Sequence, residues 1–305
     1  MTIKDRISVA IPDSSLSDEK GLREKTLKIG KFARTFSIFG VEKIVIYKDP
    51  TETRKKSDMF LLNLILEFLN TPQYLRKSIY PMNSDLSYIG LLPPIRAPQH
   101  TNKVRIKDVK VGEIRVGVLH DKNSMLKKMD RKTFTNTDKS IINFNKERFD
   151  FYIDVGLHYP IPFLGEGRDG EKVVVKFVNS YPHLKVIKAS GRDLEKLYLG
   201  YSIVKVNSLE DFLKKLDEKT FVIFTSKNGR IFKSVEFQFK QSINNFENLL
   251  IVFGSPSKGI KEIYTNYHTT KNSMYLNMFP DQKTQTIRLE EAILGTLTLF
   301  NHFLL

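Results

Sequence analysis

The order of apolar segments along the chain constrains its fold more than any other feature of the sequence. Residues 6–12 alternate apolar and polar side chains as a strand does, and residues 19–39 carry an apolar stripe of helical period. Residues 43–47 form a short apolar run typical of a buried strand, and further helices are predicted over 54–69 and 72–77. Strand, helix and strand in this order make a βαβ unit, so we expect an α/β domain with a parallel sheet.

After residue 88 the pattern changes to short strand-like runs separated by Gly, Asn and Asp. Pro93, Pro94 and Pro98 interrupt helices at the start of this region. The strands predicted there are 109–119, 141–143, 149–156 and 172–178. Several short strands without a convincing helix predict a small β-barrel of the OB type.

The α/β pattern returns after residue 184. Strands are predicted over 201–206, 221–225 and 249–253, with helices over 209–216 and 288–303. We therefore expect one α/β domain made of residues 1–87 and 179–305, interrupted by a β-barrel insertion at residues 88–178.

The charge of the chain suggests a class of partner. It has 49 Lys and Arg against 34 Asp and Glu, which gives a net charge of +15. Such an excess favours a polyanion, because neutralising phosphates releases counterions, although a basic protein without nucleic acid is as compatible with charge alone. Aromatic side chains of the insertion would stack on RNA bases or, alternatively, fill the barrel core; these are Phe144, Phe149, Phe151, Tyr152 and Tyr159.

Several classes of site and location are not expected from this sequence. There is no cysteine, and the six histidines show no metal-ligand spacing, so we expect no metal centre. Without an N-terminal signal or an apolar run of about 20 residues, we expect a cytoplasmic protein that is not in a membrane. Gly254 and Gly259 have the glycine spacing of a phosphate loop, but Ile260 stands where that loop needs lysine.

Three loops follow predicted strands of the second α/β part. They comprise residues 225–229, 254–259 and 279–284. Ligands of open α/β sheets bind at the carboxyl ends of the strands, and glycines in such loops let a ligand approach the backbone. These loops are therefore the predicted ligand site.

Residues 277–294 resemble the last motif of the SPOUT, or class IV, methyltransferases. More narrowly, they resemble the RNA methyltransferase branch shared by archaea and eukaryotes. Residues 67–77 and 90–94 are similar to other segments of that branch, and residues 252–255 are similar to its second cofactor loop. The resemblance covers nearly the whole chain and is weakest over 103–178.

This resemblance implies a fold, a cofactor and a substrate. The fold is a parallel-sheet SPOUT domain with a C-terminal trefoil knot, although knots are otherwise essentially absent from proteins. The expected activity is S-adenosylmethionine (SAM)-dependent methylation of ribosomal RNA, with uridine N3 favoured over ribose 2′-O, by a homodimer with a composite active site. The implied cofactor residues are Thr225, Ser226, Gly229, Gly254, Ser255, Pro256, Gly259, Asn277, Phe279, Pro280, Gln282, Thr286, Ile287 and Ala292. The family often has glycine where Asp281 and Lys283 stand here.

Methyl transfer to a nitrogen or hydroxyl removes a proton, so a nearby cation would stabilise the resulting anion. Arg34, where related enzymes often carry arginine, is our first catalytic candidate, and Arg288 is the second; an ion-pairing surface role is the alternative for Arg34. Glu290 and Glu291 fall in the first turn of the last helix, where we favour a structural role with the helix dipole. A catalytically silent RNA-binding or ribosome-assembly scaffold is the alternative function.

Overall fold

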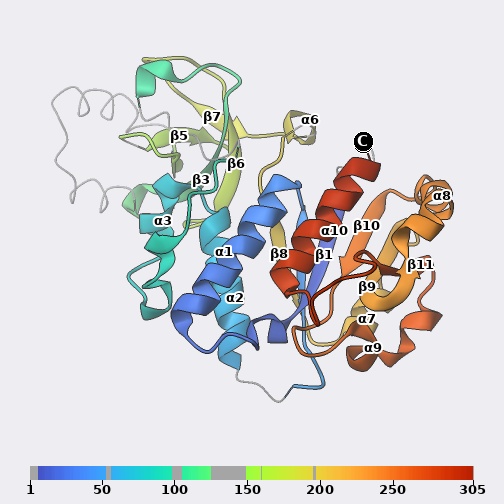
Figure 1. Cartoon of the computed structure of the whole chain (residues 1–305). Helices are drawn as coiled ribbons and strands as arrows, with labels where there is room; N and C mark the ends of the chain where they lie inside the picture. The colour runs from blue at the N-terminus through green and yellow to red at the C-terminus, as the bar shows by residue number, and fades with distance from the viewer. Residues whose placement is uncertain are drawn as a thin grey trace. The chain divides into compact units, whose positions relative to one another are not determined.

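The computed structural model describes residues 6–52, 56–97, 105–124, 149–158, 160–194 and 197–304. The chain forms two compact units, each built from separate stretches of sequence (Figure 1). The first unit comprises Met1–Asn70, Met82–Ile95 and Gly200–Leu305. The second comprises Thr71–Pro81 and Arg96–Leu199.

A six-stranded parallel sheet forms the centre of the first unit, which confirms the predicted α/β class. Its strand order is β11 (Ser273–Asn277), β9 (Thr220–Ile231), β10 (Asn248–Val252), β1 (Ile7–Pro12), β2 (Lys43–Tyr47) and β8 (Ser202–Val206). Every neighbouring pair is parallel. The central strand β1 is buried at all but one position, as expected for a parallel strand covered on both faces.

Helices pack on the sheet through alternating strand residues. Side chains such as Val45, Phe224 and Val252 form one core with α7 (Leu209–Lys214) and α9 (Ile260–Ile263). In another cluster, α8 (Phe232–Ile243) and α10 (Leu289–Phe303) contact one another and β9 through Phe221, Phe232, Phe239 and Phe300. Helix α1 (Leu22–Ile38) packs on both α2 (Lys56–Asn70) and α10. Short 3-10 turns complete this unit: η2 (Asp13–Leu16), η3 (Ser84–Leu86), η4 (Ile89–Leu91) and η6 (Thr265–Thr269).

A closed five-stranded barrel forms the second unit, as predicted. Its strands are β3 (Ile114–Asp121), β4 (Phe151–Asp154), β5 (Ile161–Leu164), β6 (Lys172–Phe177) and β7 (Val186–Lys188), in the order β3-β4-β5-β7-β6. Pairing of β3 with β6 closes the barrel, and only β5 and β7 pair in parallel. The interior is apolar and includes Leu119, Ile153 and Phe163. Short helical segments η5 (Ile106–Asp108) and α6 (Gly191–Leu194) accompany it.

The barrel unit reaches beyond residues 88–178. Strand β7 lies after residue 178 in the sequence, but it belongs to the barrel, which it completes by pairing with β5 and β6. Helix α3 (Gln73–Ile79) also belongs to this unit, since Leu75 packs on Val116 and Val118. The Tyr74 hydroxyl donates a hydrogen bond to the carbonyl oxygen of Val116 at 2.7 Å. Conversely, Met82–Ile95 packs with the parallel sheet.

Within the described ranges, no helix is long and apolar enough to cross a membrane.

Candidate active site

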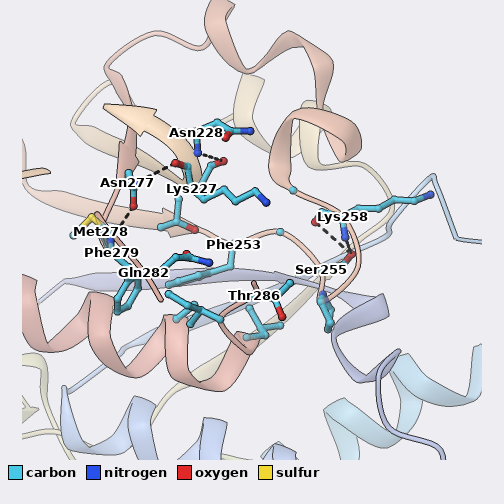
Figure 2. A pocket seen from close by; sticks show the side chains of 18 of the residues that line it. Lys227, Asn228, Phe253, Ser255, Lys258, Asn277, Met278, Phe279, Gln282 and Thr286 are labelled. Carbon is cyan, nitrogen blue, oxygen red and sulfur yellow. Dashed lines mark hydrogen bonds between the residues drawn. The ribbon is translucent and has the colours of Figure 1, made fainter. Parts of the chain in front are cut away.

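The three segments predicted as ligand loops meet at one edge of the sheet, where they enclose a cavity of about 280 Å³ (Figure 2). Residues 254–259 and 279–284 follow β10 and β11, but residues 225–229 are not a loop after a strand: they lie within β9, at an irregularity across which Phe224 pairs with Tyr275 and Arg230 with Leu276. This volume is close to the lower end of the roughly 300–1,000 Å³ typical of small-molecule sites. The first turns of α10 add an apolar wall. The lining residues are Thr225, Ser226, Lys227, Asn228, Phe253, Gly254, Ser255, Pro256, Ser257, Lys258, Gly259, Glu262, Asn277, Met278, Phe279, Gln282, Gln285, Thr286, Ile287, Leu289, Ala292 and Thr296.

The loop after β10, residues 254–259, folds back on itself. The backbone N–H of Ser255 donates to the Lys258 carbonyl oxygen at 2.9 Å, and the Lys258 N–H donates to Ser255 Oγ at 2.9 Å. A Cβ on Gly254 would lie 2.7 Å from the Lys258 carbonyl oxygen. Glycine is therefore required at position 254 by the loop's own turn.

Neighbouring segments fix the same loop from outside. Lys258 Nζ donates to the carbonyl oxygen of Thr51 at 3.0 Å, and the buried Tyr47 hydroxyl donates to the carbonyl oxygen of Phe253. Thr225 Oγ1 donates to the carbonyl oxygen of Val252 at 3.1 Å, which joins β9 to the end of β10. The loop after β10 is thus held by β9, by β2 and by the residues that follow β2.

The loop after Thr225 approaches β11 closely. A Cβ on Gly229 would lie 2.4 Å from the carbonyl carbon of Leu276, so only glycine allows the two backbones to pass. Asn277 Nδ2 donates to the Lys227 carbonyl oxygen at 2.8 Å. Asn277 Oδ1 in turn accepts from the Phe279 N–H at 2.9 Å. Gly229 therefore shapes the site through the backbone and does not itself line the cavity.

The remaining wall is the segment 279–288, which runs from β11 to α10. Gln282 Nε2 donates to the carbonyl oxygens of Thr284 and Gln285, at 2.9 and 3.2 Å. Asp281 has φ +57°, in the left-handed region that glycine tolerates best and aspartate better than most residues. This backbone conformation favours glycine, the residue that the family resemblance implies at position 281.

The structure brings most of the predicted cofactor residues to one cavity. All except Gly229 and Pro280 line it, and Pro280 is exposed. The charged residues that line the cavity were not predicted as cofactor residues; they are Lys227, Lys258 and Glu262. Apolar lining residues such as Met278 were not predicted either. Lys227 and Lys258 lie inside the predicted loops, whereas Glu262 lies on α9 and reaches the cavity because α9 starts directly after the loop.

Glu262 is the single carboxylate among the lining residues, which are otherwise neutral or cationic. Burial raises the pKa of the nearby Tyr275 phenol, which also hydrogen-bonds to Ser226. The described residues contain no cluster of three His, Asp or Glu that would hold a metal ion.

Neither predicted catalytic arginine lines this cavity. Arg34 is exposed on α1, and its guanidinium makes no hydrogen bond or ion pair with any described residue. Arg288 lies between the lining residues Ile287 and Leu289, but its side chain is 63% exposed and lies 4.0 Å from Glu19. Glu291 Oε2 accepts the Arg288 backbone N–H at 3.0 Å, which confirms a structural role for Glu291 at the start of α10.

Comparison with known proteins identifies the family. A human 28S rRNA (uridine-N(3))-methyltransferase is 27% identical over 315 residues, covering 95% of this chain and 76% of that protein. The mouse protein of the same name is 26% identical, covering 95% of this chain and 74% of its own length. An uncharacterised protein of Haloarcula marismortui is 24% identical, covering 95% and 97%. Residues 6–300 match the family described as "Putative RNA methyltransferase", so the chain belongs to this RNA methyltransferase family.

Proposed function

We propose that this protein transfers a methyl group from SAM to ribosomal RNA, at N3 of a uridine. One observation carries the proposal: three loops, separate in sequence and predicted as cofactor loops, enclose a single cavity at the carboxyl edge of the sheet. The relatives named 28S rRNA (uridine-N(3))-methyltransferase support the choice of substrate atom. The net charge of +15 suits a polyanionic substrate.

The chemistry of the cavity fits SAM. Ile287, Leu289 and Ala292 offer an apolar surface for an adenine ring. Asn277, Gln282 and Thr286 offer amide and hydroxyl groups that can hydrogen-bond to the ribose hydroxyls and to the polar groups of the methionine part of SAM. Lys227 and Lys258 match a carboxylate, and Glu262 matches an ammonium group or ribose hydroxyls. When bound, SAM supplies an activated methyl group, so this chain mainly has to bind, orient and exclude water.

Uridine N3 carries a proton that must leave during methylation, and a cation near the base favours the anion. Lys227 and Lys258 are the cations that line the cavity in one chain, and Lys258 Nζ already donates to the Thr51 carbonyl oxygen. Since Arg34 is exposed and does not line this cavity, its catalytic role requires that a second chain present it. We therefore propose a homodimer whose active site combines the cavity of one chain with Arg34 of the other, and with Arg288 beside the cavity for an RNA phosphate.

The trefoil knot is part of the same proposal. Its support is local: β11 passes the irregular part of β9 so closely that Gly229 has no room for a Cβ, and the segment 279–288 then returns along the cavity. In this arrangement the knot would hold the third cavity wall in place.

Isothermal titration of the protein with SAM, followed by transfer of labelled methyl to ribosomal RNA, tests the proposal. We expect saturable binding in wild type and none in Gly254→Trp, with transfer lost in Arg34→Ala although SAM binding is retained. RNA binding without SAM binding, even when RNA is present, would instead favour the silent scaffold.

We also propose that the barrel binds RNA. Two exposed or half-buried aromatic rings lie beneath lysines: Lys185 Nζ is 5.7 Å from the Phe149 ring centre, and Lys107 Nζ is 5.6 Å from the Tyr181 ring centre. Such pairs suit single-stranded RNA, where stacking contributes about 1–3 kcal/mol per base. Phe151 packs against the barrel core, and Tyr152 is 2% exposed although it is not part of that core. Phe144 and Tyr159 lie outside the described residues.

The Phe149→Ala/Tyr181→Ala variant checks this assignment. We expect at least tenfold weaker RNA binding by filter assay, with SAM affinity unchanged because the cavity belongs to the other unit. Unchanged RNA affinity would remove the barrel's aromatic rings from the RNA interface.

A further inference from the structure

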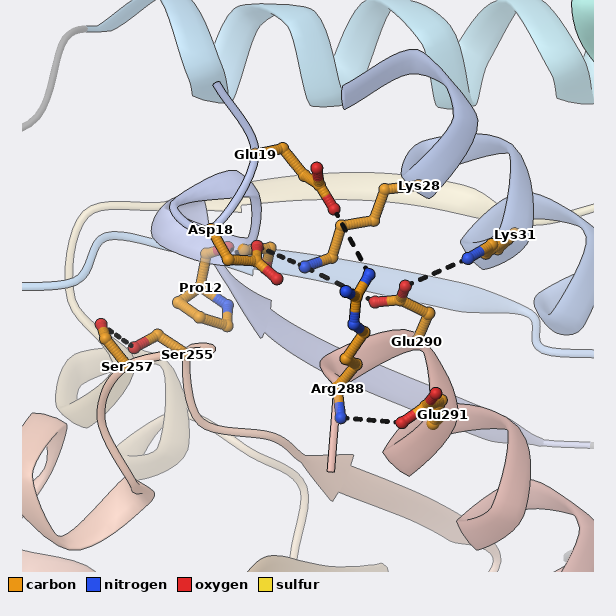
Figure 3. A network of polar contacts seen from close by, with 11 residues as sticks. Pro12, Asp18, Glu19, Lys28, Lys31, Ser255, Ser257, Arg288, Glu290 and Glu291 are labelled. Carbon is orange, nitrogen blue, oxygen red and sulfur yellow. Dashed lines mark hydrogen bonds and ion pairs between the residues drawn. The ribbon is translucent and has the colours of Figure 1, made fainter. Parts of the chain in front are cut away.

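A buried ionic cluster joins α1 to the start of α10 (Figure 3). The Lys28 side chain is only 1% exposed, and its Nζ lies 2.5 Å from Asp18 Oδ1 and 3.5 Å from Glu290 Oε2. Glu290 is 5% exposed, and its other oxygen accepts from Lys31 Nζ at 3.2 Å. We call Asp18, Lys28, Lys31 and Glu290 the α1–α10 ion cluster.

Burial makes this cluster sensitive to the loss of any one charge. Glu290 Oε2 has no hydrogen-bond partner within the described part of the chain, so Lys28 is the buried charge that compensates it, whereas Lys31, which pairs with Oε1, is 60% exposed. Removing one partner of a buried ion pair leaves the other charge uncompensated in a medium of low dielectric constant, which is strongly destabilising. If Lys28 is removed, the uncompensated charge of Glu290 is therefore relieved most readily by displacement of the Glu290 side chain toward water.

Such a displacement would affect the cavity directly. Glu290 lies in the first turn of α10, between the lining residues Leu289 and Ala292 and just after Thr286 and Ile287. The segment 279–288 contains no helix or strand, so its position depends on β11 at one end and on the start of α10 at the other. The ion cluster fixes this second end.

We propose that Lys28 is a positioning residue for the cofactor cavity: through Glu290 it holds the segment 279–288 in its binding conformation. The expected effect on SAM affinity rests on the proposed function. The expected effect on the conformation of the segment 279–288 is independent of that function, because it can be measured without ligand.

The same helix provides a matched control. Lys25, one turn before Lys28, pairs with Asp58 of α2 at 2.6 Å, with the two side chains 18% and 12% exposed. This pair is mostly buried and joins α1 to α2, and neither residue lines the cavity. Lys25→Met therefore reproduces the loss of an α1 ion pair without touching the segment 279–288.

The first experiment is amide hydrogen exchange on ligand-free wild type, Lys28→Met and Lys25→Met, with melting temperatures recorded for each. We expect both variants to melt earlier, but only Lys28→Met to exchange faster, by at least tenfold, at the hydrogen-bonded amides of Arg288, Glu291 and Ala292, where the segment 279–288 joins α10. Glu290→Gln should behave as Lys28→Met does, and Lys28→Arg should restore much of the protection. Equal exchange of this segment in Lys28→Met and Lys25→Met would overturn the proposal.

Titration with SAM then measures the functional effect. The dissociation constant should rise at least tenfold in Lys28→Met and stay within twofold in Lys25→Met, while KM for RNA remains unchanged in both. A loss of affinity that simply follows melting temperature in both variants would reduce Lys28 to a stabilising residue. If wild type itself binds no SAM, the proposed function fails, and the exchange result alone decides the positioning role.

Discussion

The two main walls of the cavity are built on different principles. The loop 254–259 is held along its length, by hydrogen bonds within itself and from Thr51 and Tyr47 on neighbouring segments. The segment 279–288 is largely exposed in its middle, and the contacts that fix it lie at its ends, at Asn277 and at Glu290. One wall of the cavity is therefore held mainly by its own turn and the hydrogen bonds along it, and the other wall is held at its ends, one of them by buried charges. Substitutions in the two walls should therefore fail in different ways.

The largest effect should come from the locally specified wall. In Gly254→Ala the new Cβ would lie 2.7 Å from the Lys258 carbonyl oxygen and 3.1 Å from the Gly259 carbonyl carbon, so the backbone itself must move. We expect SAM affinity to fall at least a hundredfold. Gly90→Ala is the control, because its Cβ would also meet nothing within 4 Å and Gly90 does not line the cavity, and it should stay within threefold. Equal losses in both variants by calorimetry would show that loop geometry does not control binding.

A smaller effect is expected in the other wall. In Gly295→Ala the new Cβ would lie 2.5 Å from two ring atoms of Phe279, which are side-chain and not backbone atoms. Replacing a helical glycine by alanine also stabilises a helix by about 1 kcal/mol. We expect an unchanged or slightly higher melting temperature together with a three- to tenfold loss of SAM affinity. A loss as large as that of Gly254→Ala would contradict the idea that this wall adapts.

Tyr47→Phe tests the external support of the loop 254–259. It removes the hydrogen bond to the Phe253 carbonyl oxygen in a fully buried position, and an unsatisfied buried group costs about 1–3 kcal/mol. We expect the free energy of unfolding to fall by this amount in a urea titration, with at most a fivefold change in SAM affinity. No change in stability would mean that the Phe253 carbonyl group finds another donor.

The smallest effect concerns Asp13, whose Oδ1 accepts the Asp49 N–H at 2.9 Å. Asp49 lies between Tyr47 and Thr51, the two residues that support the loop 254–259. Burial, and then the charge of Asp49, raise the pKa of the Asp13 carboxyl, although hydrogen bonds oppose this. Its ionised form is therefore disfavoured in the folded state, and stability falls as pH rises through the folded-state pKa. Asp13→Asn should melt later than wild type near pH 7 and at the same temperature below about pH 3.9. A gain that is equal at both pH values would exclude ionisation as its cause.

Much of the fold followed from the sequence because its periodicities are strong. The elements that were not predicted are those with weak patterns. Strand β5 contains Pro162, strand β7 has three residues, and β11 mixes polar with apolar side chains. Helix α8 was not predicted either, and its Phe237 is 75% exposed, outside the apolar stripe.

The candidate site was predicted to a similar degree. Its loops carry motifs that a single sequence reveals, so most lining residues were found. The supports of those loops were not, because they join distant segments: Lys258 contacts Thr51 across 207 residues, and Lys31 contacts Glu290 across 259. No local pattern encodes such pairs. Arg34 was expected at the active site, and whether it acts there depends on a second chain.

The position of β1 in the sheet has a consequence for synthesis of the protein. This strand, which precedes the other strands of the sheet in sequence, lies at the centre, and Ile7 pairs with Leu249. Until β10 is made, a nascent chain carrying β1, β2 and β8 keeps one edge of the buried strand β1 open, and open strand edges invite aggregation. Pairing across such a separation also slows folding, since a long loop must close before the contact forms. The barrel, whose strands all lie between β2 and β8 in sequence, has every pairing partner available before the sheet does. The strands that carry the cavity, β9, β10 and β11, are the last to be made. The sheet and the candidate active site are therefore completed in the same step.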